Sequence, residues 1–136
     1  MTELLLDTSV AVPLLVTSHL AHAAVAGSVG DRSVALAGHA LHETYAVLTR
    51  LPGDARVAPA DAVRLLGERF APPAVLDARS ARAAPVVLAN SGIAGGATYD
   101  GLVALAARAS RLPLATRDRR AQGTYRLLGV SVQTIG

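Results

Sequence analysis

The sequence contains no cysteine, no lysine and no tryptophan. Without cysteine the chain can form neither a disulfide nor a thiolate metal site. Without lysine it cannot form a Schiff base or supply the phosphate-binding lysine of a P-loop, and no GxGxxG turn for a dinucleotide is present. No segment reaches the roughly 18 apolar residues of a membrane span. The N-terminus carries Glu3 and Asp7 and lacks the basic start of a signal peptide, so we expect a cytoplasmic protein without a membrane segment.

Apolar residues are plentiful: 51% of the 136 residues are hydrophobic, but only 3% are aromatic. That length suits one domain, expected to span residues 1–136, and the hydrophobic fraction suffices for a core. Apolar positions filled mainly by Ala, Leu and Val favour closely packed helices over a β-sandwich. All thirteen basic residues are arginines, and the net charge of +3 permits a polyanionic partner without requiring one.

Short apolar runs and helical periodicities alternate along the chain. They predict strands at 3–7, 33–37, 112–116 and 130–135, and helices at 18–29, 40–51, 59–70, 80–90, 98–110 and 119–128. Residues 75–77 are either a short strand or a loop, and the apolar run 10–16, interrupted by Pro13, is assigned no element. The alternation predicts an α/β fold around a mostly parallel sheet.

Four of the ten acidic residues occupy informative positions. Asp7 and Asp118 follow predicted strands, and in open parallel sheets ligands bind outside the carboxyl ends of the strands. Asp100 and Glu43 lie on helix stripes otherwise formed by alanine and valine, where a carboxylate is costly unless a cation compensates it.

Each position also has a local explanation. Asp7 and Asp118 are good helix N-caps, Asp100 favours the positive end of its helix, and Glu43 can be solvated. Taken together, the four positions favour a carboxylate cluster that holds a divalent metal.

Five motifs in a fixed order cover nearly the whole chain. They are LLLDTSV (4–10), HETYAVLTRLP (42–52), GATYDGLVALAAR (96–108), PLATRDRRA (113–121) and TYRLLGV (124–130). The set resembles the PIN domain of VapC-type toxins of type II toxin–antitoxin systems. The resemblance implies a three-layer α/β/α fold and a metal-dependent endoribonuclease. It places Asp7 and Asp100 on the main metal ion, Asp118 in its shell or at a second ion, and Glu43 at the site directly or through water.

Oxygen ligands without cysteine suit Mg²⁺ or Mn²⁺ rather than Zn²⁺. Beside Asp118, the hydroxyl of Thr116 and the side chains of Arg117, Arg119 and Arg120 are candidates for substrate binding, as phosphate contacts or as groups that orient the carboxylates. Arg126 lies nearby in the sequence. The alternative for the arginines is a solvated helix face, and Thr116 is equally compatible with a plain strand position.

The sequence is also compatible with other functions. The pairs His19/His22 and His39/His42 have the i, i+3 spacing of a zinc site, although no HExxH motif is present. The chain could also be a non-catalytic module that binds RNA or a protein. Receiver-like and dehalogenase-like phosphoryl-transfer domains also have an aspartate at the end of their first strand, as Asp7 is here. They are excluded because their active site requires a lysine, which this chain lacks.

The same resemblance implies partners. These are an RNA substrate, a cognate VapB-like antitoxin that blocks the carboxylate site, often with a basic side chain, and a second copy of the chain in a homodimer. Helices 18–29 and 40–51 are mainly apolar and could form a groove for an amphipathic antitoxin helix, or could be ordinary core.

Overall fold

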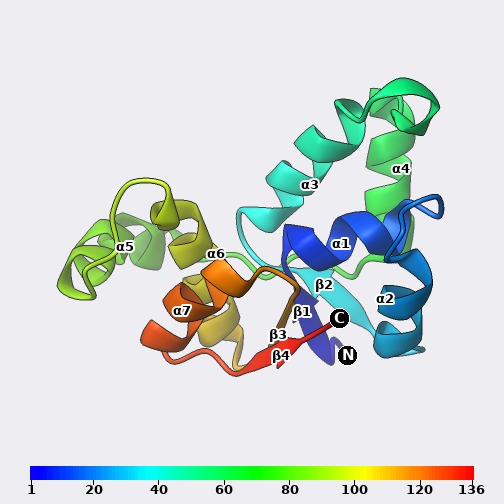
Figure 1. Cartoon of the computed structure of the whole chain (residues 1–136). Helices are drawn as coiled ribbons and strands as arrows, with labels where there is room; N and C mark the ends of the chain where they lie inside the picture. Colours follow the sequence, from blue (N-terminus) through cyan, green and yellow to red (C-terminus); the bar gives the residue numbers. More distant parts are fainter.

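A computed structural model describes residues 1–136 and contains one four-stranded sheet (Figure 1). Its strands are β1 (Leu4–Leu6), β2 (Val34–Leu36), β3 (Leu114–Thr116) and β4 (Val132–Thr134). All three pairings are parallel, and the spatial order is β2-β1-β3-β4. The predicted α/β fold with a mostly parallel sheet is therefore confirmed, although each strand is shorter than its sequence pattern.

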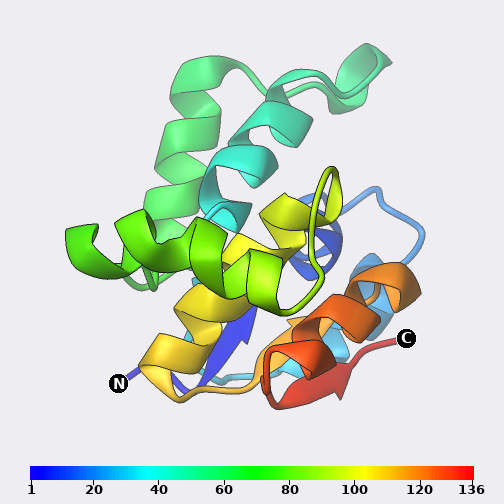
Figure 2. The ribbon, with the colours of Figure 1, turned by 90° about the vertical axis from the view of Figure 1, so that its left-hand side faces the viewer.

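Seven α-helices and one 3₁₀ turn connect the strands. They are α1 (Thr8–Leu15), α2 (His22–Val29), α3 (Ala40–Thr49), the turn η1 (Gly53–Ala55), α4 (Pro59–Arg69), α5 (Ala78–Asn90), α6 (Ala97–Ser110) and α7 (Arg119–Leu127). None of these helices is both long and apolar enough to cross a membrane. Helices α3 and α4 form an antiparallel hairpin that projects beyond the sheet (Figures 1 and 2).

Helix α1 was not predicted. It is short, almost uniformly apolar and largely buried, so it has no polar stripe from which a helical period can be recognised. Pro13 lies inside it and removes one backbone donor, which the sequence pattern takes as a helix break. The sequence feature that correctly marks the start of α1 is Asp7. It acts as the N-cap of this helix by accepting a hydrogen bond from the backbone of Ser9.

Two helix starts differ from the sequence pattern. Helix α2 begins at His22 rather than beside Ser18, without a side-chain cap. Helix α5 begins at Ala78 rather than at residue 80, because Asp77 is its N-cap and accepts a hydrogen bond at Oδ1 from the Ser80 backbone. The segment 75–77, for which a strand and a loop were both possible, is a loop, although the preceding residue, Ala74, forms an isolated parallel bridge with Ala37.

The strand order explains where the layers lie. From the central pair β1 and β3, the chain crosses to β2 on one side and to β4 on the other. Because such crossovers are right-handed, their helices fall on opposite faces of the sheet. Helices α1 and α2 cover one face and α6 and α7 the other, over a core that includes Leu4, Leu6 and Leu114 (Figure 1). The point where the order reverses, between the carboxyl ends of β1 and β3, is where this class of sheet binds ligands.

Candidate functional site

An acidic cavity of about 180 Å³ lies at this reversal point. It is lined by Asp7, Thr8, Ser9, Glu43, Asp100, Val103, Asp118 and Tyr125. All four predicted carboxylates therefore line one cavity, although they come from the ends of β1 and β3 and from the first turns of α3 and α6.

Asp7 is the most firmly held of the four carboxylates, with only 5% of its surface exposed. Its Oδ1 accepts hydrogen bonds from the backbone N–H of Ser9 (3.0 Å) and from the Ser9 hydroxyl (2.6 Å). Its Oδ2 accepts from the phenol of Tyr125 at 2.8 Å. Both oxygens are thus oriented by protein donors, one set local and one from α7.

Tyr125 was not assigned a role from the sequence, and it is 1% exposed. Burial is the main cause that raises the pKa of its phenol, and the nearby charge and hydrogen bond of Asp7 raise it further. The phenol therefore stays protonated and donates its hydrogen to Asp7 at any pH at which the protein is studied. Two sequence features could have pointed to Tyr125: it lies in the last of the five motifs, and it is one of only three tyrosines in the chain.

Ser9 and Thr116 join the loops that follow β1 and β3. The Ser9 hydroxyl accepts from the backbone N–H of Arg117 (2.8 Å) and lies 3.3 Å from the Thr116 hydroxyl. Thr116 Oγ1 accepts in turn from the Asp118 backbone (3.0 Å). Thr116 is fully buried, so the predicted substrate contact by this residue does not fit the structure; its hydroxyl positions the loop that carries Asp118.

Asp118 is the N-cap of α7, and its Oδ1 accepts from the backbones of Arg120 (2.9 Å) and Ala121 (3.3 Å). Asp7 and Asp118 are therefore helix caps, as the local explanation predicts, and they also line one cavity with Asp100 and Glu43. The cap fixes the Asp118 side chain toward the cavity, and its Oδ2 makes no hydrogen bond within the protein.

Asp100 and Glu43 sit in the first turns of their helices without acting as caps. Burial is the main cause that raises the pKa of Asp100, and the charges of Asp118, Asp7 and Glu43 raise it further. Asp100 is thus close enough to the other three carboxylates to be affected by their charges. The one salt bridge of the structure joins Arg64 and Asp61 on α4, so no arginine neutralises the cavity.

An all-oxygen site with surplus negative charge suits a hard divalent cation. Neither a basic side chain nor a cysteine lines the cavity. The donor set therefore fits a cation in chemistry and charge. In the present side-chain conformations no three of the carboxylates lie close enough to enclose an ion, so binding would require side-chain rotation.

Comparison with known proteins places the chain in a family. The PIN-domain profile matches residues 4–127. The chain belongs to the PIN-domain family. Ribonuclease VapC27 of Mycobacterium tuberculosis is 60% identical over 129 residues, which are 95% of this chain and 94% of that protein. Ribonuclease VapC40 of the same species is 42% identical over 130 residues, covering 95% of this chain and 96% of that protein.

Solved structures confirm the PIN fold at low sequence identity. VapBC2 from Rickettsia felis, bound to a promoter DNA fragment, aligns with a TM-score of 0.67 at 14% identity, over 99% of this chain and 100% of that one. FitAcB from Neisseria gonorrhoeae aligns with a TM-score of 0.64 at 22% identity, over 95% of both chains.

A basic groove of about 500 Å³ continues from the acidic cavity of this PIN domain. Both hollows are lined by Thr8, Ser9 and Asp118. The groove adds Arg117, Arg119 and Arg120, so the structure brings the three predicted arginines to the edge of the carboxylate site. Arg119 and Arg120 are exposed, and Arg117 is half-buried with an unpaired Nε. Arg126, also exposed, does not line the groove.

Neither histidine pair of the PIN domain belongs to a group of three or more side chains placed to hold a metal ion. His19 Nδ1 accepts from the Ala21 backbone (3.0 Å), and His22 Nδ1 donates to the Pro13 carbonyl (2.8 Å), so the first pair stabilises the turn between α1 and α2. His39 and His42 lie at the start of α3, where the ring of His39 stacks on Tyr99.

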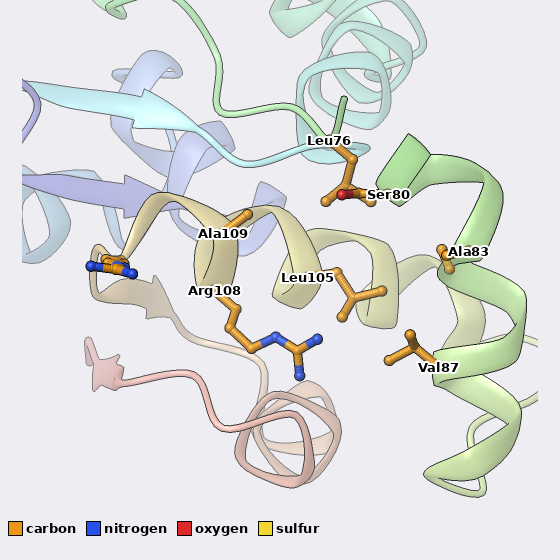
Figure 3. A pocket seen from close by; sticks show the side chains of 9 residues that line it. Leu76, Ser80, Ala83, Val87, Leu105, Arg108 and Ala109 are labelled. Atoms are coloured by element: carbon orange, nitrogen blue, oxygen red, sulfur yellow. The ribbon is translucent and has the colours of Figure 1, made fainter. Parts of the chain in front are cut away.

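A different cavity, of about 360 Å³, lies between α5 and α6 (Figure 3). Leu76, Val87 and Leu105 give it apolar walls, and Arg108 and Arg111 line it as well. It contains no carboxylate, so it lacks the groups for metal-assisted chemistry and is separate from the candidate active site.

Proposed function

We propose that this PIN domain is a Mg²⁺- or Mn²⁺-dependent endoribonuclease that acts as the toxin of a toxin–antitoxin pair. The observation that carries the proposal is the acidic cavity, in which four carboxylates from distant parts of the chain meet without a counter-cation. The relatives that are 60% and 42% identical over most of the chain are named ribonucleases, which supports the same conclusion.

Asp7, Asp100 and Asp118 are the proposed metal ligands, with Glu43 binding directly or through water. If these carboxylates held a divalent cation, it would supply the activation of a water molecule for attack on a phosphodiester and would offset charge on the leaving oxygen. The two helix caps and the Tyr125 phenol hold Asp7 and Asp118 in place before the cation arrives. Glu43 is exposed and Asp100 is partly exposed, so these two side chains are the ones free to rotate.

The basic groove binds the RNA backbone in this proposal. Arg119 and Arg120 project from the start of α7 and contact phosphates on one side of the cleaved bond, while Asp118 faces the acidic cavity. Arginine is well suited to this task because its planar group binds phosphate oxygens in pairs. Affinity for RNA should therefore fall steeply as salt is raised.

The test uses the purified chain, free of any partner, with total bacterial RNA in Mg²⁺, Mn²⁺ or EDTA, followed by sequencing of the RNA ends. Discrete cuts that require the metal and are lost in Asp100→Asn support the nuclease, with Asp54→Asn as control because Asp54 is exposed in η1 and outside the cavity. RNA retention without cleavage would favour the non-catalytic binding module. Cleavage that persists in EDTA or in Asp100→Asn would exclude the metal mechanism.

The antitoxin partner is also proposed. Helix α3 packs on α1 and α4 rather than on α2, so the groove expected between helices 18–29 and 40–51 is not the one that forms. The apolar groove that does form, of about 320 Å³, lies between α3, α4 and the loop after α4 and includes Leu41, Leu66 and Phe70. It suits the apolar face of a VapB-like helix, whose basic side chain would reach the carboxylates. Leu66→Arg should weaken inhibition by the antitoxin while cleavage is retained; unchanged inhibition would contradict this surface.

Homodimerisation is the remaining proposal about partners. It is tested by sedimentation of the purified chain over a concentration series, in which a protein that stays monomeric throughout contradicts it.

A further inference from the structure

Three aromatic side chains gather at the starts of α3 and α6, the helices that carry Glu43 and Asp100. The rings of His39 and Tyr99 stack with centroids 4.7 Å apart and planes 27° from parallel. The ring of His42 lies 6.4 Å from that of His39, at 40°. We call His39, His42 and Tyr99 the aromatic platform.

The platform arises from the same two helix starts that supply two of the site carboxylates. His39 is the residue before α3 and lies one turn from Glu43, so the two occupy the same side of that helix. Tyr99 directly precedes Asp100 in the first turn of α6. A ligand bound by Glu43 and Asp100 is therefore held at the same two helix starts as the platform.

The exposure of the platform distinguishes it from ordinary core. Tyr99 is 53% exposed and His42 is also exposed, whereas Tyr125, the tyrosine that lines the cavity, is almost fully buried. The chain has only three tyrosines and one phenylalanine. The stack thus combines a half-buried His39 with a Tyr99 that exposes more than half of its surface, so the aromatic face of Tyr99 is accessible to a ligand.

The two sides of the cavity thus differ in chemistry. The side formed by α1 and α7 carries the arginines of the basic groove, which suit phosphates. The side formed by α3 and α6 carries the platform, which suits a flat aromatic ligand. Unpaired RNA bases are recognised by stacking on Tyr and His side chains, and phosphates by arginine.

We propose that the aromatic platform stacks an unpaired RNA base next to the scissile phosphate, with Tyr99 as the main contact. This inference rests on the proposed ribonuclease function, and it adds the residues that recognise a base. The alternative is that the His39–Tyr99 stack only ties α3 to α6.

The test measures binding separately from cleavage. The Asp100→Asn chain in Mg²⁺ is titrated with fluorescein-labelled octamers of oligoadenylate and oligouridylate, and with octamers carrying one abasic site at each position in turn. Tyr99→Ala, Tyr99→Leu and Tyr99→Phe are compared in this background. Tyr45→Ala is the matched control, since Tyr45 is another exposed tyrosine on α3 that lines neither hollow.

The expected result is a loss of affinity of roughly tenfold to hundredfold in Tyr99→Ala and Tyr99→Leu, the range typical of one stacked base. Tyr99→Phe and Tyr45→Ala should stay within about twofold of the parent, because Phe keeps the aromatic face and Tyr45 is not involved. One abasic position should weaken binding to the parent and have no further effect in Tyr99→Leu.

Three results would overturn the proposal. The first is unchanged affinity for RNA in Tyr99→Ala, and the second is equal sensitivity to the abasic site in the parent and in Tyr99→Leu. The third is full affinity in Tyr99→Leu, because any bulky apolar side chain would then suffice and the role of Tyr99 would be structural. Cleavage by the wild-type chain is measured independently. If no RNA is cut but the abasic site and Tyr99 remain coupled, the ribonuclease function fails and base stacking stands.

Discussion

Replacing Tyr125 by Phe is the sharpest test of how the candidate site is held together. The change deletes one oxygen and leaves the ring, which is 1% exposed, in place. The lost interaction is the 2.8 Å hydrogen bond from the phenol to Asp7 Oδ2. Asp7 is itself 5% exposed, so little water is available to replace the missing donor.

The expected loss of stability follows from this geometry. A hydrogen bond to a charged group contributes roughly 1.5–3 kcal/mol. For a domain of this length the unfolding entropy is about 0.3 kcal/mol per kelvin, so Tm should fall by roughly 5–10 °C. Asp7 Oδ1 keeps its donors from Ser9, so the carboxylate should remain in the cavity but be less firmly oriented. Loss of a group that orients a metal ligand commonly weakens metal affinity about 10- to 100-fold.

The assay is thermal unfolding at neutral pH in EDTA and across a Mg²⁺ series, with Tyr45→Phe as control because Tyr45 lies on the surface. The raised pKa of the Tyr125 phenol gives a sign to the pH dependence. Its contribution is complete below about pH 10, the ordinary tyrosine pKa, and is lost as pH rises above it. A Tyr125→Phe protein that melts within about 1 °C of wild type, with unchanged Mg²⁺ dependence, would refute the reasoning.

Three further outcomes are expected. In EDTA, Asp100→Asn should have a higher Tm than wild type at neutral pH, and this difference in Tm should narrow toward pH 4. The reason is that the pKa of Asp100 is raised in the folded protein, so the stability of the wild type falls as pH rises through that pKa. Parallel Tm curves between pH 4 and 8 would contradict this. Gly38→Ala should lower the free energy of unfolding in urea by about 1–2 kcal/mol, since φ there is +50° and a Cβ would lie 3.3 Å from Ala106 Cβ and from the Leu102 carbonyl oxygen; an unchanged midpoint would contradict it. Thr44→Val should raise the urea midpoint and the free energy of unfolding, the latter by about 1 kcal/mol, because the fully buried Thr44 hydroxyl has no hydrogen-bond partner. A lowered midpoint would contradict this, since it would mean that the hydroxyl is hydrogen-bonded.

The parts of the fold that the sequence predicted are those set by local chemistry. Buried strands are short apolar runs, and Asp7 and Asp118 follow them as helix caps, so both strand ends could be found without knowing the sheet order. Helix α1 was missed because its burial on nearly all sides removes the polar stripe that marks other helices, and because Pro13 lies within it.

The parts that were not predicted depend on long-range packing. Tyr125 meets Asp7 across 118 residues, and the His39–Tyr99 stack joins residues sixty apart; both require the order β2-β1-β3-β4, which no local pattern encodes. Thr116 is the converse case. Its position beside Asp118 suggested a substrate contact, but the same strand that brings it there also buries its hydroxyl.

The four carboxylates divide into two kinds according to how the protein stabilises their charges. Asp7 and Asp118 sit at helix N-termini and accept backbone hydrogen bonds, so their charges are stabilised by the protein itself. Asp100 and Glu43 cap no helix end, and it is Asp100 whose pKa is raised by burial and by the other three. Binding of a divalent cation should therefore be felt most at Asp100, with release of a proton from it when the metal binds in mildly acidic solution. Calorimetric titration of Mg²⁺ in buffers of different ionisation enthalpy measures that proton directly, and Asp100→Asn should abolish it. Proton release that persists in the variant would assign the effect to another group and contradict this division of the site.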